Sequence, residues 1–95
     1  MYEALKQKYV ASFTTKSEQI NQALGCSDIQ ALTVLVHQMA GSSGSYGFDQ
    51  ISALCIQIED LILKTHNINP AVEQKCQQLL TLLSSHINDS KHSAN

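Results

Sequence analysis

Apolar residues recur at helical spacing along almost the whole chain, and this periodicity restricts the fold more than any other feature. In four segments the apolar side chains fall three or four positions apart, which places them on one side of an α-helix. No segment shows the sustained alternation of apolar and polar residues that is typical of a β-strand. The segments that we expect to be helical are 2–24, about 28–45, about 48–64 and about 70–87.

The connections between these segments are short and carry residues that begin or end helices. Ser27, with Gln30 three residues later, is typical of a capping box that opens the second helix. Gly47 predicts the turn before the third helix, and Asn69 followed by Pro70 is a start signal for the last. The sequence therefore predicts an all-α protein, an antiparallel up-and-down four-helix bundle.

The first and last parts of the chain carry two further expectations. Segment 2–24 is long enough for one helix or two short collinear ones, and we expect any bend at Thr14 and Thr15, because paired β-branched residues lower helix propensity. Residues 88–95 are polar, and we expect them to form a frayed C-terminal tail. Residues 1–95 thus form a single domain with its core at about 2–87.

The composition is that of one small folded module. Its 95 residues, 43% of them hydrophobic and 15% charged, are too few for a catalytic domain with a separate nucleotide-binding domain. A net charge of -2 and six scattered basic residues give no basic face for nucleic acid. The sequence contains no run of eighteen apolar residues, which is about the length needed to span a bilayer. The amphipathic N-terminus is not typical of a signal peptide.

Cysteine and histidine spacing predicts neither disulfides nor a metal site. The number of cysteines is odd, and none stands in a CxxC or CxxH pair, so we expect reduced thiols in a cytoplasm. Two of them, Cys55 and Cys76, lie on apolar helical faces, where a free cysteine acts as a small hydrophobe; the third is Cys26. Three histidines form no i, i+4 ligand pair: His66, His86 and His92.

The remaining histidine lies near the middle of the second predicted helix, on the side away from the apolar residues. At about 100° per residue, one side of this helix holds Leu32, Leu35, Val36, Met39 and Ser43, and the other holds Gln30, Thr33, His37, Gly41 and Gly44. His37 should therefore face solvent. A glycine inside a helix costs about 0.5–1 kcal/mol relative to alanine, yet two lie beside this ring. We expect another molecule to approach the imidazole over this bare backbone.

The residues around His37 resemble the signature of histidine phosphotransfer (HPt) domains. The matching stretch, HQMAGSSGSYGF, runs from His37 to Phe48 and continues into an apolar helix with Ile51, Leu54, Cys55, Ile58 and Glu59. The family pattern has the histidine, a glycine and a small pair, then a second glycine and an apolar helix that ends in an acidic or amide residue. One departure is Ala40, which stands where many members carry a lysine that is thought to help hold a phosphoryl group.

The resemblance implies the same helical bundle and a role as a phosphorelay intermediate. His37 would take a phosphoryl group from an aspartyl phosphate of one receiver domain and pass it to another receiver. The implied partners are response-regulator receiver domains and a hybrid sensor kinase, with no nucleic acid and no membrane. We expect a cytoplasmic monomer. The residues that we expect to dock a receiver are Gln30, Thr33, Gln38, Ala40, Gly41 and Gly44.

The chemistry of such a transfer sets further expectations. A histidine with an ordinary pKa near 6.5 supplies a neutral nucleophile at cellular pH, and an acceptor on its other ring nitrogen would fix the tautomer. Glu59 is the candidate acceptor, in line with the family pattern; the alternative is an ordinary solvated carboxylate. Ser42 and Ser43 lack the context of a hydroxyl nucleophile, and we interpret them as small spacers against a neighbouring helix.

The chain lacks two features that an independent kinase would need. It has no phosphate-binding glycine loop, so we expect a phosphocarrier without ATP-dependent kinase activity. It has no clustered carboxylates either, so we expect no bound cofactor, with Mg²⁺ supplied by the partner receiver domain. A second hypothesis is a non-catalytic helical adaptor that only docks receiver domains, and Ala40 keeps this alternative open.

Overall fold

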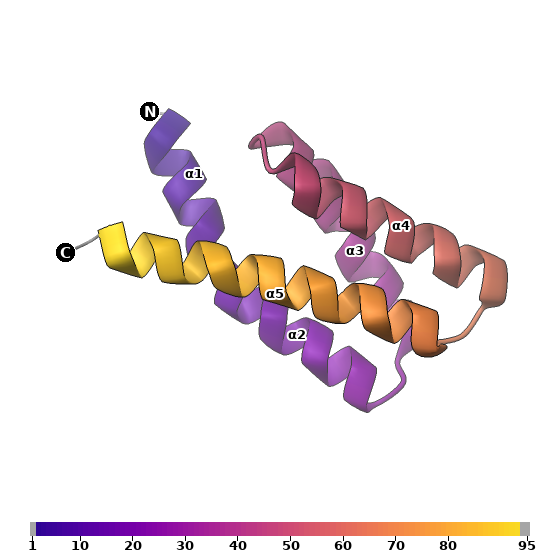
Figure 1. Ribbon diagram of the computed structural model, residues 1–95. Helices are drawn as coiled ribbons and strands as arrows, with labels where there is room; N and C mark the ends of the chain where they lie inside the picture. Colours follow the sequence, from indigo (N-terminus) through magenta and orange to yellow (C-terminus); the bar gives the residue numbers. More distant parts are fainter. Residues whose placement is uncertain (1, 94–95) are drawn as a thin grey trace.

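The computed structural model describes residues 2–93, and the side chains of residues 4–88. Five helices and no strand make up this part of the chain (Figure 1), so the all-α prediction is confirmed. The helices are α1 (Tyr2–Ala11), α2 (Phe13–Gly25), α3 (Ile29–Ser45), α4 (Asp49–Thr65) and α5 (Pro70–Ser93).

The first predicted segment forms two helices, and the break between them lies at Ser12. The Ser12 hydroxyl and its backbone N–H both donate to the carbonyl oxygen of Tyr9, and such a local bond competes with regular helix. The predicted bend at Thr14 and Thr15 is wrong, since both residues lie inside α2 with exposed side chains. A residue of low helix propensity is tolerated at an exposed position when its neighbours pack well, and the neighbouring Phe13 is buried.

The start of α3 also differs from the sequence pattern. Asp28 is the N-cap, and its carboxylate accepts from the backbone N–H of Ala31 at 3.1 Å. The predicted capping box of Ser27 and Gln30 is therefore wrong. Ser27 instead takes a left-handed conformation, with φ of 53°, in the turn that follows α2.

Two other boundaries follow the predicted signals, and one does not. Gly47 turns the chain with φ of 84°, a conformation that a glycine adopts without strain. The Asn69 side chain accepts from the N–H of Val72 at 2.9 Å and so caps α5. The predicted end of the last helix near Ile87 is wrong, because α5 continues to Ser93. No glycine or proline follows Ile87 to stop it.

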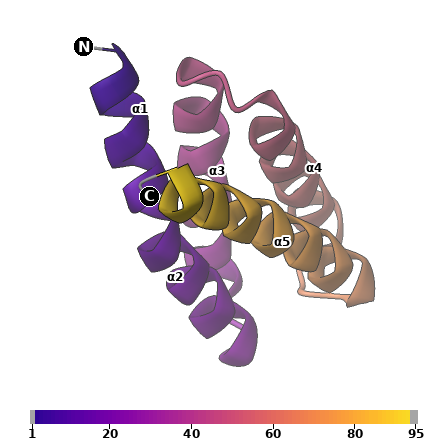
Figure 2. The same cartoon turned by 60° about the vertical axis from the view of Figure 1, so that its left-hand side comes forward.

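Helices α2 to α5 form the bundle, and α1 packs at one end of it. Helix α3 packs against α4, α4 against α5, and α2 against both α5 and α3, while α1 contacts α5 and α2 (Figures 1 and 2). The molecule is elongated, with extents of 42 × 22 × 17 Å. The largest fully buried side chains are Phe13, Ile20, Leu32, Met39, Ile51, Ile58, Leu79 and Leu83.

The buried cysteines belong to this core, as predicted. Cys55 on α4 and Cys76 on α5 have no exposed surface, whereas Cys26 is exposed. Burial raises the pKa of the Cys55 thiol to about 12 and that of Cys76 to about 11. Both thiols are therefore protonated at neutral pH and act as small apolar side chains.

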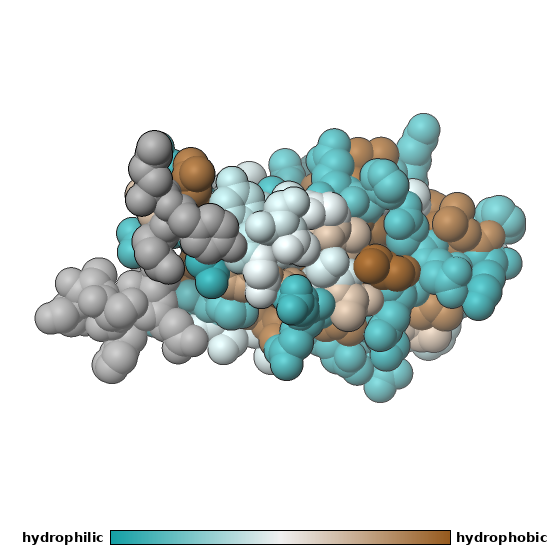
Figure 3. Space-filling view, turned by 90° about the horizontal axis from the view of Figure 1, so that it is seen from above, coloured by the Kyte–Doolittle hydropathy of each residue, from teal (hydrophilic) through white to brown (hydrophobic). Residues whose placement is uncertain are grey.

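The face of the molecule that is seen from above has mixed hydropathy (Figure 3). From above, brown apolar residues stand singly or in small groups among teal hydrophilic ones (Figure 3). Between residues 2 and 93 there is no helix that combines the length and the apolar character needed to cross a membrane.

Candidate functional site

His37 projects into solvent from the middle of α3. Its side chain is 73% exposed, while Leu32, Val36 and Met39, on the opposite side of the same helix, are buried. The Asp28 cap and the Gly47 turn define the two ends of α3. The helical pattern of the sequence thus places this histidine correctly.

Glu59 of α4 holds one nitrogen of the His37 ring. His37 Nδ1 lies 2.8 Å from Glu59 Oε2, and the glutamate side chain is only 23% exposed. Because an ionised carboxylate only accepts hydrogen bonds, the ring proton belongs on Nδ1. Nε2 then carries the free lone pair and can act as a nucleophile. Glu59 is therefore a partner of His37 in this structure and not an isolated solvated carboxylate.

A hydrogen bond between α3 and α4 fixes their register close to this pair. The Ser52 hydroxyl donates to the backbone carbonyl of Ala40 at 2.8 Å, so half-buried Ala40 faces α4. Ser52 was not among the residues predicted for the site. A serine on the border of an apolar stripe carries no signal of its own, because its acceptor lies twelve residues away.

The glycines beside His37 leave open space above α3. A Cβ atom added at Gly41 would meet no heavy atom within 4 Å, and one at Gly44 would meet only Ser52 Oγ, at an ordinary 3.5 Å. Neither glycine is needed for close helix packing. The other predicted docking residues also lie along α3: Gln30 and Gln38 are exposed, and Thr33 is half-buried.

Three large apolar side chains flank the His37–Glu59 pair. Val34 precedes His37 by three residues, and Ile56 and Leu63 lie three residues before and four after Glu59. Residues at these spacings share a helix face. Their exposed fractions are 50%, 55% and 59%. We call these three residues, together with His37 and Glu59, the His37 surface. The apolar part of this surface was not predicted from the sequence.

A chain of hydroxyl groups ties α1 to the C-terminal half of α3. The Tyr9 hydroxyl lies 2.6 Å from Ser42 Oγ and 2.9 Å from Ser43 Oγ. Because Ser42 donates its proton to the carbonyl of Gln38, Tyr9 must donate to Ser42 and accept from Ser43. The serines do face a neighbouring helix, as expected, but they bind it by hydrogen bonds. The Tyr9 ring also stacks on Tyr46, with centroids 4.7 Å apart.

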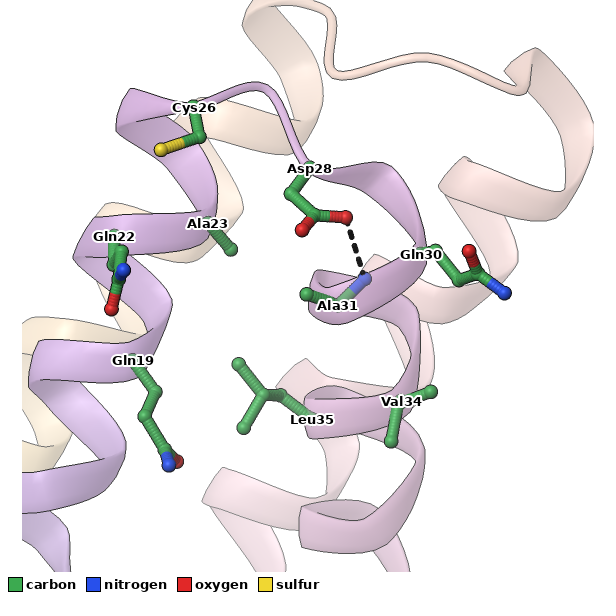
Figure 4. A pocket seen from close by; sticks show the side chains of 9 residues that line it. All are labelled: Gln19, Gln22, Ala23, Cys26, Asp28, Gln30, Ala31, Val34 and Leu35. Atoms are coloured by element: carbon green, nitrogen blue, oxygen red, sulfur yellow. Dashed lines mark hydrogen bonds between the residues drawn. The ribbon is translucent and has the colours of Figure 1, made fainter.

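An open groove lies between α2 and the first half of α3 (Figure 4). Gln19 and Gln22 line it from α2, and Ala31 and Leu35 line it from α3. Val34 belongs both to this groove and to the His37 surface. The groove and the His37 surface therefore share one side chain, Val34.

Metal-binding geometry is not found in the described residues. Within this part of the chain, no three histidine, cysteine or carboxylate side chains lie close enough together to hold an ion.

Comparison with known proteins gives one family. The family model described as Hpt domain matches residues 4–89, which is nearly the whole chain. No curated protein and no solved structure gives a significant match.

Proposed function

Because this chain belongs to the Hpt domain family, which serves histidine phosphotransfer in phosphorelays, we propose that His37 is the residue that carries the phosphoryl group. One observation above all supports this assignment: the ring is exposed while Glu59 holds its Nδ1 at 2.8 Å. Nε2 is thereby left free and directed toward solvent.

The transfer that we propose uses the two ring nitrogens differently. Nε2 attacks the phosphorus of an aspartyl phosphate on a receiver domain, so the N–P bond forms as the P–O bond breaks and the aspartate leaves as a carboxylate. The Nδ1 proton stays on the ring. The carboxylate of Glu59 accepts it in a hydrogen bond and stabilises the positive charge of the phosphorylated imidazole. The reverse sequence passes the group to a second receiver. Mg²⁺ held by the receiver would neutralise charge on the phosphoryl oxygens.

Hpt domains interact with response-regulator receiver domains, and we propose that the His37 surface is the docking site here. The exposed side chains of Val34, Ile56 and Leu63 share helix faces with His37 and Glu59 and add apolar area to this surface. Gly41 leaves room for close approach. Apolar side chains that become buried on docking are typical of the core of a specific interface.

The remaining parts of the proposal concern the whole molecule. We propose an antiparallel up-and-down order for α2 to α5, supported by the short connections between them. We also propose that the protein is a cytoplasmic monomer, and that it links a hybrid sensor kinase to receiver domains without using ATP itself. The phosphoryl group then moves only between His37 and aspartates of its partners.

Transfer of label from a receiver tests this function. The chain is mixed with a radiolabelled phosphoreceiver and Mg²⁺, and we expect an acid-labile, alkali-stable label on the wild-type chain. His37→Gln should fold normally, because the position is exposed, and should accept no label. If the glutamine variant is labelled at the wild-type rate, His37 is not the acceptor. If the wild type binds the receiver but never takes up label, the chain is a helical adaptor.

A further inference from the structure

We propose that Ser52 of α4 is a positioning residue for phosphoryl transfer, an inference that rests on the proposed function. Ser52 acts through Glu59 and not on the phosphoryl group itself. Its hydroxyl donates to the Ala40 carbonyl of α3 at 2.8 Å, and Glu59, on the same helix as Ser52, places Oε2 at 2.8 Å from His37 Nδ1. The first contact holds α4 in the rotation that the second contact needs.

Ser52 and Glu59 lie on the same side of α4. They are seven residues apart, which is about 20° short of two full helical turns and about 10.5 Å along the axis. On α3, Ala40 follows His37 by three residues, or close to one turn. A rotation of α4 about its own axis would therefore carry Ser52 away from Ala40 and turn Glu59 away from the histidine ring. The bond of Ser52 opposes this rotation, because hydrogen bonds are directional.

The contact between His37 and Glu59 is by itself a weak constraint on the two helices. The side chain of the histidine is 73% exposed, and exposed pairs of flexible side chains contribute little to stability. A serine hydroxyl, in contrast, is bonded directly to Cβ, so the hydrogen bond of Ser52 to a backbone carbonyl links the two helix backbones closely.

The part of α3 close to Ser52 has small side chains. Half-buried Ala40 provides the carbonyl, and a Cβ atom added at Gly44, one turn further, would lie 3.5 Å from Ser52 Oγ. The short serine side chain can therefore reach the backbone of α3. Its neighbours Ile51 and Cys55 are buried and apolar, and apolar packing is non-directional. The hydroxyl of Ser52 thus adds an orientation that packing alone does not specify.

The direction of Glu59 determines which ring nitrogen of His37 can react. With the carboxylate at Nδ1, the proton stays there and Nε2 is free. A neutral imidazole that loses this partner carries its proton mainly on Nε2, and a protonated nitrogen has no lone pair with which to attack phosphorus. Loss of the Ser52 hydroxyl should therefore lower the share of the reactive tautomer, although His37 and Glu59 are both still present.

A small phosphoryl donor tests this without a protein partner. Phosphoramidate phosphorylates imidazole directly: Nε2 bonds to phosphorus, the P–N bond breaks, and the nitrogen leaves as ammonia. Ser52→Ala should fold, because alanine has the highest helix propensity, and we expect it to form phosphohistidine roughly three- to tenfold more slowly than wild type. Ser52→Thr keeps the hydroxyl and should stay within about twofold.

Ser45→Ala is the matched control. The Ser45 hydroxyl also donates to a carbonyl of α3, that of Gly41 at 3.1 Å, but this bond lies within one helix and joins no two helices. The control variant should therefore react like wild type.

Two further measurements separate positioning from a general loss of stability. Nitrogen-15 NMR of the neutral His37 ring should show a smaller share of the Nδ1–H tautomer in Ser52→Ala than in wild type. Adding Ser52→Ala to Glu59→Ala should slow labelling no further, because the serine acts through the glutamate.

An unchanged labelling rate or an unchanged tautomer share in Ser52→Ala would overturn the role of Ser52 alone. Two other results would also overturn it, because each would indicate a packing role: effects of Ser52→Ala and Glu59→Ala that multiply, or a threonine variant as slow as the alanine variant. A wild-type chain that phosphoramidate never labels on His37 would overturn the proposed function, and the role of Ser52 with it.

Discussion

Replacing Gly41 with glutamine separates docking from folding. The structure gives the expected change in stability: a Cβ at this position meets nothing within 4 Å, so no packing is lost. Glycine is about 1 kcal/mol less favourable than alanine inside a helix, and glutamine is close to alanine. Gly41→Gln should therefore stabilise the protein by somewhat under 1 kcal/mol, which corresponds to a rise in Tm of a few degrees for a domain of this size.

Transfer from a receiver should nevertheless fall steeply. Gly41 lies one helical turn beyond His37, and a long side chain there would stand between the imidazole and the incoming aspartyl phosphate. A misplacement of about an ångström can lower the rate on the order of a hundredfold. Labelling by phosphoramidate, which is small enough to pass the new side chain, should stay within about threefold of wild type.

Three measurements on the same variant check this reasoning: thermal unfolding, labelling by a phosphoreceiver and labelling by phosphoramidate. The matched control is Gly25→Gln, because Gly25 also has open space around it but lies at the end of α2. The control should transfer at the wild-type rate. A Gly41→Gln protein that melts earlier and still accepts phosphoryl groups normally would refute the docking role.

Further predictions concern the residues around His37 and the buried thiols. Glu59→Ala should slow transfer roughly 10- to 100-fold, because a hydrogen bond to a charged group contributes about 1.5–3 kcal/mol; an unchanged rate with a phosphoreceiver would contradict its orienting role. Ala40→Lys should fold normally and give faster transfer or a longer-lived phosphohistidine, which single-turnover labelling and a decay time course would detect. Folding raises the pKa of the Cys55 and Cys76 thiols above the ordinary value of 9.0. Their contribution to stability is therefore complete below pH 9 and is lost as the pH rises toward 12, so urea unfolding midpoints should fall across this range. Replacing both thiols with alanine should weaken that dependence.

The sequence predicts His37 and Glu59 because their placement depends on features that repeat along a single helix. A period of 3.6 residues decides which side of α3 is exposed, and the family motif points to Glu59. The helix boundaries depend on competition between neighbouring side chains. Asp28 takes the capping position that Ser27 was expected to hold. Ser12 interrupts the first helical segment, although the bend was expected at Thr14 and Thr15.

The sequence pattern does not predict contacts between residues that lie far apart along the chain. The bond from Ser52 to the Ala40 carbonyl and the bonds of Tyr9 to two serines depend on how helices meet in space. Ile56 and Leu63 are apolar but exposed, because they lie outside the buried stripe of α4. Tertiary packing, and not local preference, determines this part of the site.

The hydrogen bond between Ser52 and Ala40 joins the two helices that carry His37 and Glu59. His37, its acceptor Glu59 and this bond all belong to one helical hairpin, α3 and α4 with the short turn between them. Distortion of α5, or partial opening of α1, need not alter the distance between the imidazole and the carboxylate. The hairpin can thus serve as a portable chemical unit, and a host bundle with different outer helices should preserve its geometry if it keeps the apolar side of the hairpin covered.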